Sequence, residues 1–251
     1  NAELELGVAG QTQDISATDT VLDGFAADAA TVGSGEIRVA VLNGGYSSGV
    51  VAQLNDDTYF NFSASLVGAS QIDSVAELAL YDVVVIGDQN SHSALASVAP
   101  ALRQWVEAGG AVVGTGWLTY AAGAATGTPV ADIDAIIPVD TSGYYTYQYN
   151  PLVNVSVHDH PVTTGISDFY PNYYVNDTAG SDAWGTVLGS ANGRPAIVVG
   201  QVGAGRSVYL SPSYTDSPSS LQSGTADRLL EQAVAWVAVR GQAYSFVANG
   251  G

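Results

Sequence analysis

The sequence contains no cysteine, no methionine and no lysine among its 251 residues. Without cysteine, disulfide bonds, thiolate metal ligands and a cysteine nucleophile are excluded. The absence of both sulfur-containing side chains fits a protein that is exposed to an oxidising environment outside the cell. We therefore expect an extracellular or cell-surface location.

Positive charge is scarce as well, because 6 arginines stand against 24 acidic residues and the formal net charge is -18. The negative electrostatic field of such a protein repels phosphate backbones, so nucleic acid is not an expected partner. The sequence has no run of about 18 apolar residues, and we expect no membrane insertion. Hydrophobic residues make up 47% of the chain, which is ample for one buried core.

Alternation of strands and helices is the clearest pattern in the sequence. Ile37–Leu42 and Asp82–Gly87 are compact β-branched runs, which are typical of buried parallel strands. Leu95–Ala108 has helical spacing of its apolar residues, and Ala111–Gly114 follows it as another strand. This alternation predicts parallel strand order. Further strands are predicted at 61–66, 153–157, 186–190, 196–199 and 206–210, and further helices at 50–54, 74–80 and 227–239.

The same pattern divides the chain into one domain with extensions. Residues 1–34 have weak periodicity and are interpreted as an N-terminal arm or linker. Residues 35–240 are predicted to form the α/β domain, and 241–251 a C-terminal tail. The alternation breaks over about 117–151, a Tyr-rich stretch that predicts a functional loop, a cap or an inserted hairpin.

Four stretches resemble the class I glutamine-amidotransferase-like superfamily, in particular the trehalose-utilisation-protein-like domains of bacterial surface and secreted proteins. They are Tyr81–Gly87, Leu102–Gly114, His160–Ile166 and Gly203–Pro212, and they span most of residues 36–240. The resemblance implies a flavodoxin-like three-layer sandwich with a mostly parallel sheet.

The same resemblance bears on catalysis. In the glutaminase branch, the strand that corresponds to Ala111–Gly114 ends in an elbow that carries a catalytic cysteine, and Thr115 stands at that place here. The strand that corresponds to 206–210 is followed in that branch by a His-x-Glu pair, and here Ser213–Thr215 occupies the position. A threonine hydroxyl is a poor nucleophile without an adjacent base. Glutaminase activity is therefore not expected, and an enzyme of any kind is not the favoured interpretation.

A ligand crevice is expected where the strand order of a flavodoxin-like sheet reverses. The loop after the first strand offers Tyr46 and Ser47, and the loop after the third offers Asp88, Asn90 and His92. Asp88 and His92 are candidate catalytic groups, although a role of Asp88 as a cap of the following helix is favoured over catalysis. The loops lack a phosphate-binding glycine motif, so no nucleotide or other cofactor is expected.

Two histidines form the densest titratable cluster. His158 and His160 point the same way on an extended segment, so they are candidate metal ligands if Asp88 or His92 supplies a third. His160 is also the third candidate catalytic residue. The alternative is that His160 serves the turn at Pro161, and no metal is expected on that interpretation.

Tyrosine is the most distinctive component of the sequence, with 14 residues. Exposed aromatic rings among few charges suit sugar stacking or protein contacts. A hairpin packed on its own domain explains the same cluster without a ligand. The candidate binding residues in this part of the chain are Thr115, Trp117, Tyr144, Tyr145 and Tyr147, and Tyr149, Tyr170, Tyr173 and Tyr174 extend the pattern.

These observations favour a non-catalytic structural or interaction module of an extracellular or cell-surface protein. Its expected partners are copies of itself, other domains of a larger surface protein, or glycans. The alternative is a hydrolase, or a carbohydrate-active or carbohydrate-binding domain, that uses the crevice at the carboxyl ends of the strands.

Overall fold

The computed structural model describes residues 36–87, 91–124, 127–141, 146–216 and 219–239. The predicted arm at 1–34 and tail at 241–251 lie outside these ranges. So do four candidate site residues, namely Asp88, Asn90, Tyr144 and Tyr145.

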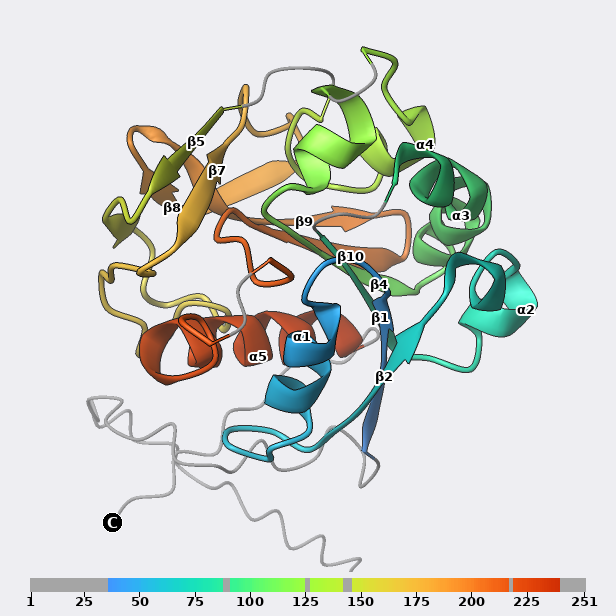
Figure 1. Ribbon diagram of the computed structural model, residues 1–251, viewed down its shortest axis with the longest axis horizontal. Coiled ribbons are helices and arrows are strands. Elements are labelled where there is room, and N and C mark those ends of the chain that lie inside the picture. The colour runs from blue at the N-terminus through green and yellow to red at the C-terminus, as the bar shows by residue number, and fades with distance from the viewer. Residues whose placement is uncertain (1–35, 88–90, 125–126, 142–145, 217–218, 240–251) are drawn as a thin grey trace, which may run out of the picture.

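One eight-stranded sheet forms the centre of the molecule (Figure 1). Its first five strands run parallel, in the order β2-β1-β3-β4-β10, and three antiparallel strands, β9, β8 and β6, extend it. The predicted flavodoxin-like fold is therefore confirmed. The strands are β1 (Ile37–Leu42), β2 (Phe62–Val67), β3 (Val83–Ile86), β4 (Ala111–Thr115), β6 (Val153–Val155), β8 (Gly185–Ala191), β9 (Arg194–Val202) and β10 (Gly205–Leu210).

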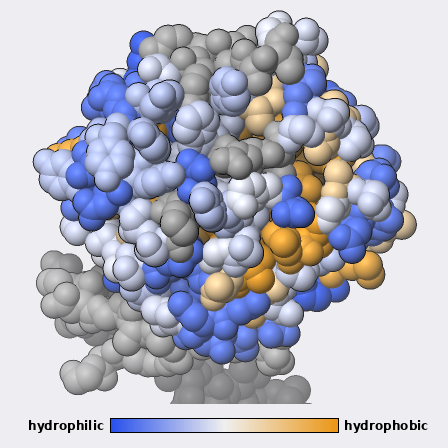
Figure 2. Space-filling view, in the orientation of Figure 1, coloured by the Kyte–Doolittle hydropathy of each residue, from blue (hydrophilic) through white to orange (hydrophobic). Residues whose placement is uncertain are grey.

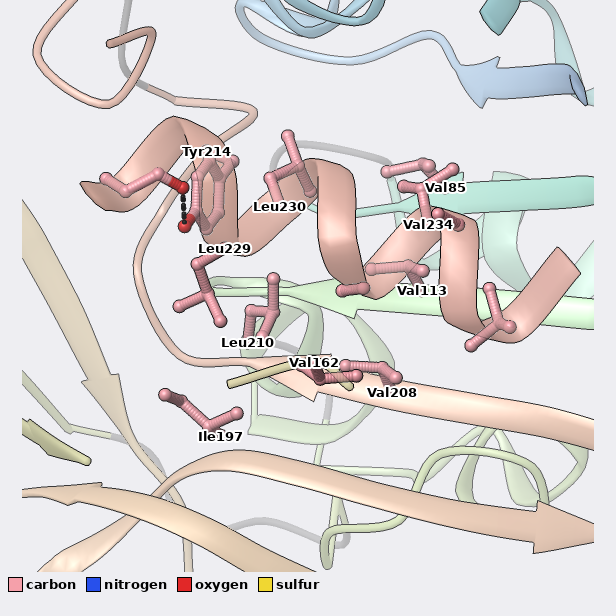
Figure 3. Packing of buried hydrophobic residues seen from close by; sticks show 14 of the residues in the cluster. Val85, Val113, Val162, Ile197, Val208, Leu210, Tyr214, Leu229, Leu230 and Val234 are labelled. Atoms are coloured by element: carbon pink, nitrogen blue, oxygen red, sulfur yellow. Dashed lines mark hydrogen bonds between the residues drawn. The ribbon is translucent and has the colours of Figure 1, made fainter. Parts of the chain in front are cut away.

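Helices cover both faces of this sheet (Figure 1). Side chains of β1 alternate between the two faces, with Val39 in one buried cluster and Ala40 in the other. Figure 3 shows how Leu230 and Val234 pack over the strands on the first face. That face carries α1 (Ser47–Leu54) and α5 (Gly224–Ala238), and the other carries η1 (Ala69–Gln71), α2 (Val75–Leu78), α3 (His92–Glu107) and α4 (Ala131–Asp134). None of the described helices is long and apolar enough to cross a membrane.

A serine caps the start of α3. Ser91 is the N-cap residue, and its hydroxyl accepts a hydrogen bond from the N–H of Ala94 at 3.1 Å. This serine satisfies a donor that a helix start leaves unpaired. Asp88, the cap that the sequence suggests, lies outside the described residues.

The Tyr-rich insertion supplies one strand of a second, two-stranded sheet. This strand, β5 (Thr146–Tyr149), pairs antiparallel with β7 (Tyr174–Asp177), which lies beyond the insertion in the sequence. The remainder of the insertion includes the π-helical turn η2 (Tyr120–Ala124). Of the three predicted alternatives, a loop, a cap or an inserted hairpin, the hairpin is not the arrangement of β5, which pairs with a distant segment.

Both edges of the large sheet are covered by the chain itself. At the outer edge of β2, Asn55 accepts the N–H of Ala64 at 2.7 Å and donates to its carbonyl at 3.0 Å. At the outer edge of β6, Val153 and Phe169 exchange N–H···O bonds of 2.9 and 3.1 Å. Free strand edges recruit other chains, and these contacts block that route.

Replacing Asn55 with Ala is expected to promote self-association, because it frees the backbone N–H and C=O at the centre of the β2 edge. Sedimentation velocity at micromolar concentrations should show a larger fraction of dimers and higher species than in the parent protein. Asn61→Ala, which removes an exposed carboxamide just before the same strand, is the control. Identical sedimentation of both variants would contradict the blocking role.

Candidate functional site

The loop after β4 has an unusual backbone. The strand ends at Thr115, a turn follows at Gly116 and Trp117, and a helical segment begins at Leu118. Trp117 has a φ of 72°, in the left-handed region that residues other than glycine rarely adopt. A strained strand-to-helix turn of this kind is where nucleophile elbows present their reactive side chain. The sequence predicts the elbow at Thr115, and the structure places it two residues further along, at Trp117.

Thr115 itself points into the protein. Its side chain is fully buried, and a Cβ atom on Gly87 would overlap both its hydroxyl and that of Thr215. No hydrogen-bond partner of the Thr115 hydroxyl is found among the described residues. A hydroxyl without a base is not activated for nucleophilic attack, and a buried one offers no surface to a ligand.

The segment after β10 is tied to its neighbours by hydrogen bonds. Ser213 donates its hydroxyl proton to Asn176 Oδ1 at 2.8 Å, and Tyr173 donates to Asp216 Oδ2 at 3.0 Å. The N–H of Tyr46 donates to the carbonyl of Thr215 at 2.7 Å. Burial, followed by the hydrogen bond to Asp216, raises the pKa of Tyr173 to about 12. The glutaminase branch has its His-x-Glu pair at this place, and here Ser213 and Thr215 form hydrogen bonds that hold neighbouring loops together.

Six aromatic side chains gather beside the elbow, and we call them the aromatic belt. Trp117 lies 5.2 Å from Tyr147 and 6.4 Å from Tyr174, measured between ring centroids. Tyr147 and Tyr149 lie 5.2 and 5.4 Å from Tyr174. The belt is half exposed, since 48% of Tyr147 and 65% of Tyr149 face solvent. Its members are Trp117, Tyr120, Tyr147, Tyr149, Tyr173 and Tyr174.

The small sheet explains why these rings meet. Tyr147 and Tyr149 are two residues apart on β5, so they share one face, and Tyr149 lies opposite Tyr174 on β7. That face turns toward Trp117. Tyr120 joins from the helical segment after the elbow, 6.0 Å from Trp117. Sequence reasoning missed Tyr120, although its spacing of three residues from Trp117 in a helical turn would have indicated it.

The remaining predicted residues of the crevice have local partners. Ser47 is buried, and its hydroxyl donates to the carbonyl of Gly44 within the turn. Tyr46 is 49% exposed beside the loop that follows β10. His92 is half-buried at the start of α3, with Nδ1 3.3 Å from the carbonyl of Ala121. Tyr46 and His92 therefore lie at the carboxyl edge, as expected.

His160 lies elsewhere. Its ring is 5.0 Å from that of Trp236, whose carbonyl accepts a hydrogen bond from Arg206. Arg206 stands at the start of β10, so this group occupies the opposite end of the sheet from Thr115. Nδ1 of His160 accepts the N–H of Val162 at 3.2 Å, and burial lowers the pKa of His160. The structure therefore separates His160 from the crevice and gives it the turn-forming role.

The metal hypothesis for His158 and His160 has no third ligand in the described part of the chain. There, no group of three His, Asp or Glu side chains is arranged to hold a metal ion. Asp88 and His92 are the two candidates for the third ligand, and Asp88 lies outside the described ranges.

The sheet order and the helices on its two faces are those of a class I glutamine-amidotransferase-like fold, and Trp117 stands at the left-handed turn after β4. Residues 79–242 match the family model of the lacto-N-biose phosphorylase central domain, and the chain belongs to this family. No curated protein sequence matches the chain.

Solved structures agree on the fold. A cytoplasmic protein of Salmonella typhimurium LT2 is 14% identical, with a TM-score of 0.65, over 80% of this chain and 99% of its own. A ThuA-like protein of Bacteroides uniformis is 18% identical, with a TM-score of 0.64, over 83% of this chain and 94% of its own. The PurLQS structure from Thermotoga maritima has a TM-score of 0.52 at 13% identity, over 80% of this chain and 99% of that one.

Proposed function

We propose that the chain is a non-catalytic carbohydrate-binding domain and that the aromatic belt is its binding surface. The observation that carries this proposal is the run of half-exposed rings, in mutual contact, at the carboxyl edge of the sheet. Flat aromatic faces stack on the apolar faces of sugars, while phenolic hydroxyls bond to sugar hydroxyl groups. Ligands of doubly wound folds also bind preferentially at this edge.

Three features support a non-catalytic role. The sequence has no cysteine, the elbow carries Trp117, and the Thr115 hydroxyl has no partner among the described residues that would accept its proton. The hydrolase alternative uses Asp88, His92, His158 and His160, and of these His160 packs against Trp236 at the other end of the sheet.

The family name supports the carbohydrate part of the proposal. The matched model describes the central domain of a phosphorylase of lacto-N-biose, which is a disaccharide. A domain of this kind would serve other domains of a larger protein. An extracellular or cell-surface location is part of the proposal, and it is supported by the absence of Cys and Met and by the net charge of -18.

Replacing Trp117 with Ala is expected to abolish glycan binding, because the indole touches both Tyr147 and Tyr174 and removing it disrupts the centre of the belt. The measurement is binding of the labelled protein to a glycan array, with circular dichroism to confirm folding. Tyr170→Ala is the matched control, since Tyr170 is 59% exposed but makes none of the belt's ring contacts. A parent protein that binds no glycan would refute the proposal.

A further inference from the structure

We infer that the binding surface extends from the aromatic belt across the carboxyl edge to Tyr46, and that it takes neutral glycan chains of several units. This inference rests on the proposed function and specifies its ligand. Two observations carry it, the continuity of the aromatic row and the charge around it.

Hydrogen bonds link the end of the belt to the loop that carries Tyr46. Tyr173 packs edge-on against Tyr174, with centroids 5.1 Å apart, and its hydroxyl donates to Asp216. Asp216 follows Thr215, whose carbonyl accepts the N–H of Tyr46. The Tyr46 phenol is 49% exposed and lies near enough to contribute to the raised pKa of Tyr173. Tyr46 therefore stands at the far end of the same row.

The row draws on loops and strands from four parts of the sequence. Tyr120 follows β4, Tyr147 lies on β5, Tyr174 lies on β7, and Tyr46 follows β1. A single sugar ring covers one or two aromatic side chains. A row of seven, fixed by a two-stranded sheet and by backbone hydrogen bonds, presents more surface than a monosaccharide can use. The geometry suits successive units of one chain, each stacked on a different part of the row.

The charged group that contacts the row is a carboxylate. Asp216 accepts a hydrogen bond from the Tyr173 hydroxyl at 3.0 Å. On the other face of the small sheet, Gln148 donates to Asp177 Oδ2 at 3.4 Å. A carboxylate this close to the row repels anionic sugars.

Four of the described arginines are held at a distance from the rings of the row. Arg38 pairs with Asp82, Arg103 pairs with Glu107 and Asp132, Arg206 bonds to Trp236 at the amino end of β10, and Arg228 bonds to Gln232. Arg194 bonds to the carbonyl of Ala179, two residues beyond β7. Uronic acids and sulfated sugars are recognised through cations, and the net charge of -18 opposes their approach. The surface therefore favours neutral chains. Much of the face shown in Figure 2 is hydrophilic or neutral, with the strongest hydrophobic colour toward the right over β2, away from β5 and β7.

The test is a glycan array with neutral and uronic-acid glycans of one to six units. Calorimetry then follows with the mono-, di-, tetra- and hexasaccharides of the neutral series that binds most strongly. Affinity is expected to rise about tenfold or more from the monosaccharide to the tetrasaccharide, since each stacked unit adds its own contribution. Tyr46→Ala keeps the backbone N–H that bonds to Thr215, so the loop should stay in place.

Tyr46→Ala is expected to weaken binding of the hexasaccharide about fivefold to tenfold and to leave the disaccharide unchanged, whereas Trp117→Ala abolishes the binding of both. Equal affinity for one unit and six units, or a preference for uronic acids, would overturn the inference and leave the proposed function standing. A parent protein that binds none of the glycans would overturn the proposed function itself. Tyr170→Ala again serves as the control.

Discussion

The Glu231→Gln variant is expected to be more stable than the parent protein by about 3 kcal/mol at pH 8 and to differ little from it at pH 5. Glu231 lies on α5 with no exposed surface. One of its oxygens accepts the N–H groups of Tyr59 and Phe60 at 3.2 and 3.1 Å, and the other has no partner among the described residues. Burial, reinforced by the nearby charge of Asp227, raises the pKa of Glu231 to about 8.

The direction of the pH dependence follows from proton binding. The pKa of Glu231 is about 8 in the folded chain and 4.5 for an unperturbed carboxyl group. Between these values the folded protein keeps a proton that the unfolded chain has lost, so the free energy of unfolding falls as pH rises. Asp227, whose pKa burial raises to about 6, acts in the same direction at lower pH. Glutamine resembles the protonated form of glutamate and does not titrate. The Glu231→Gln variant therefore lacks the part of the pH dependence of the unfolding free energy that comes from Glu231.

Urea unfolding of both proteins at intervals from pH 5 to pH 8 measures this difference. Glu36→Gln, which removes one carboxylate from an exposed position, controls for the change in net charge. The explanation is wrong if the parent protein is equally stable at both ends of this range, or if the two variants behave alike.

The Gly116→Ala variant is expected to lose about 3 kcal/mol of stability or more, and glycan binding with it. A Cβ at this position would overlap the carbonyl of Ser211 and would lie 2.7 Å from Asn176 Oδ1. The backbone has little room to move away, because Gly116 donates its N–H to Pro212 and Asn176 donates its own to Ser211. The elbow that presents Trp117 would therefore shift.

Thermal unfolding gives a direct measurement. A loss of about 3 kcal/mol lowers the Tm of a domain of this size by roughly 6 to 12 °C. Gly180→Ala is the matched control, since nothing lies within 4 Å of the Cβ it would add. If the two variants melt at the same temperature, the close approach at Gly116 is not important for stability.

Much of the fold could be predicted because its signals are local. The β-branched runs of β1 and β3 and the apolar stripes of α3 and α5 each fit one secondary structure, and their alternation predicts parallel order. The pairing of β5 with β7 could not be predicted in this way. These strands are separated by β6 and a run of turns, and the residues of β5 and β7 do not indicate which strand each one pairs with.

The elbow illustrates a different limit. In Thr115-Gly116-Trp117, glycine is the residue that a sequence pattern would assign to a left-handed conformation. The structure uses Gly116 for close approach to the β10 segment instead, and the left-handed φ falls on Trp117. Which of the two roles a glycine serves depends on a neighbouring strand that lies far away in the sequence.

The sheet order also has a consequence for the newly made chain. β4 pairs with β10, and roughly 90 residues separate the two strands, so a ribosome that adds about 5 to 20 residues per second needs about 5 to 20 seconds to supply the missing neighbour. During that interval β4, whose residues are all buried in the finished sheet, lacks its neighbour β10 on one edge. A strand edge without its partner presents N–H and C=O groups to other chains, so late supply of β10 leaves the growing chain open to association at β4.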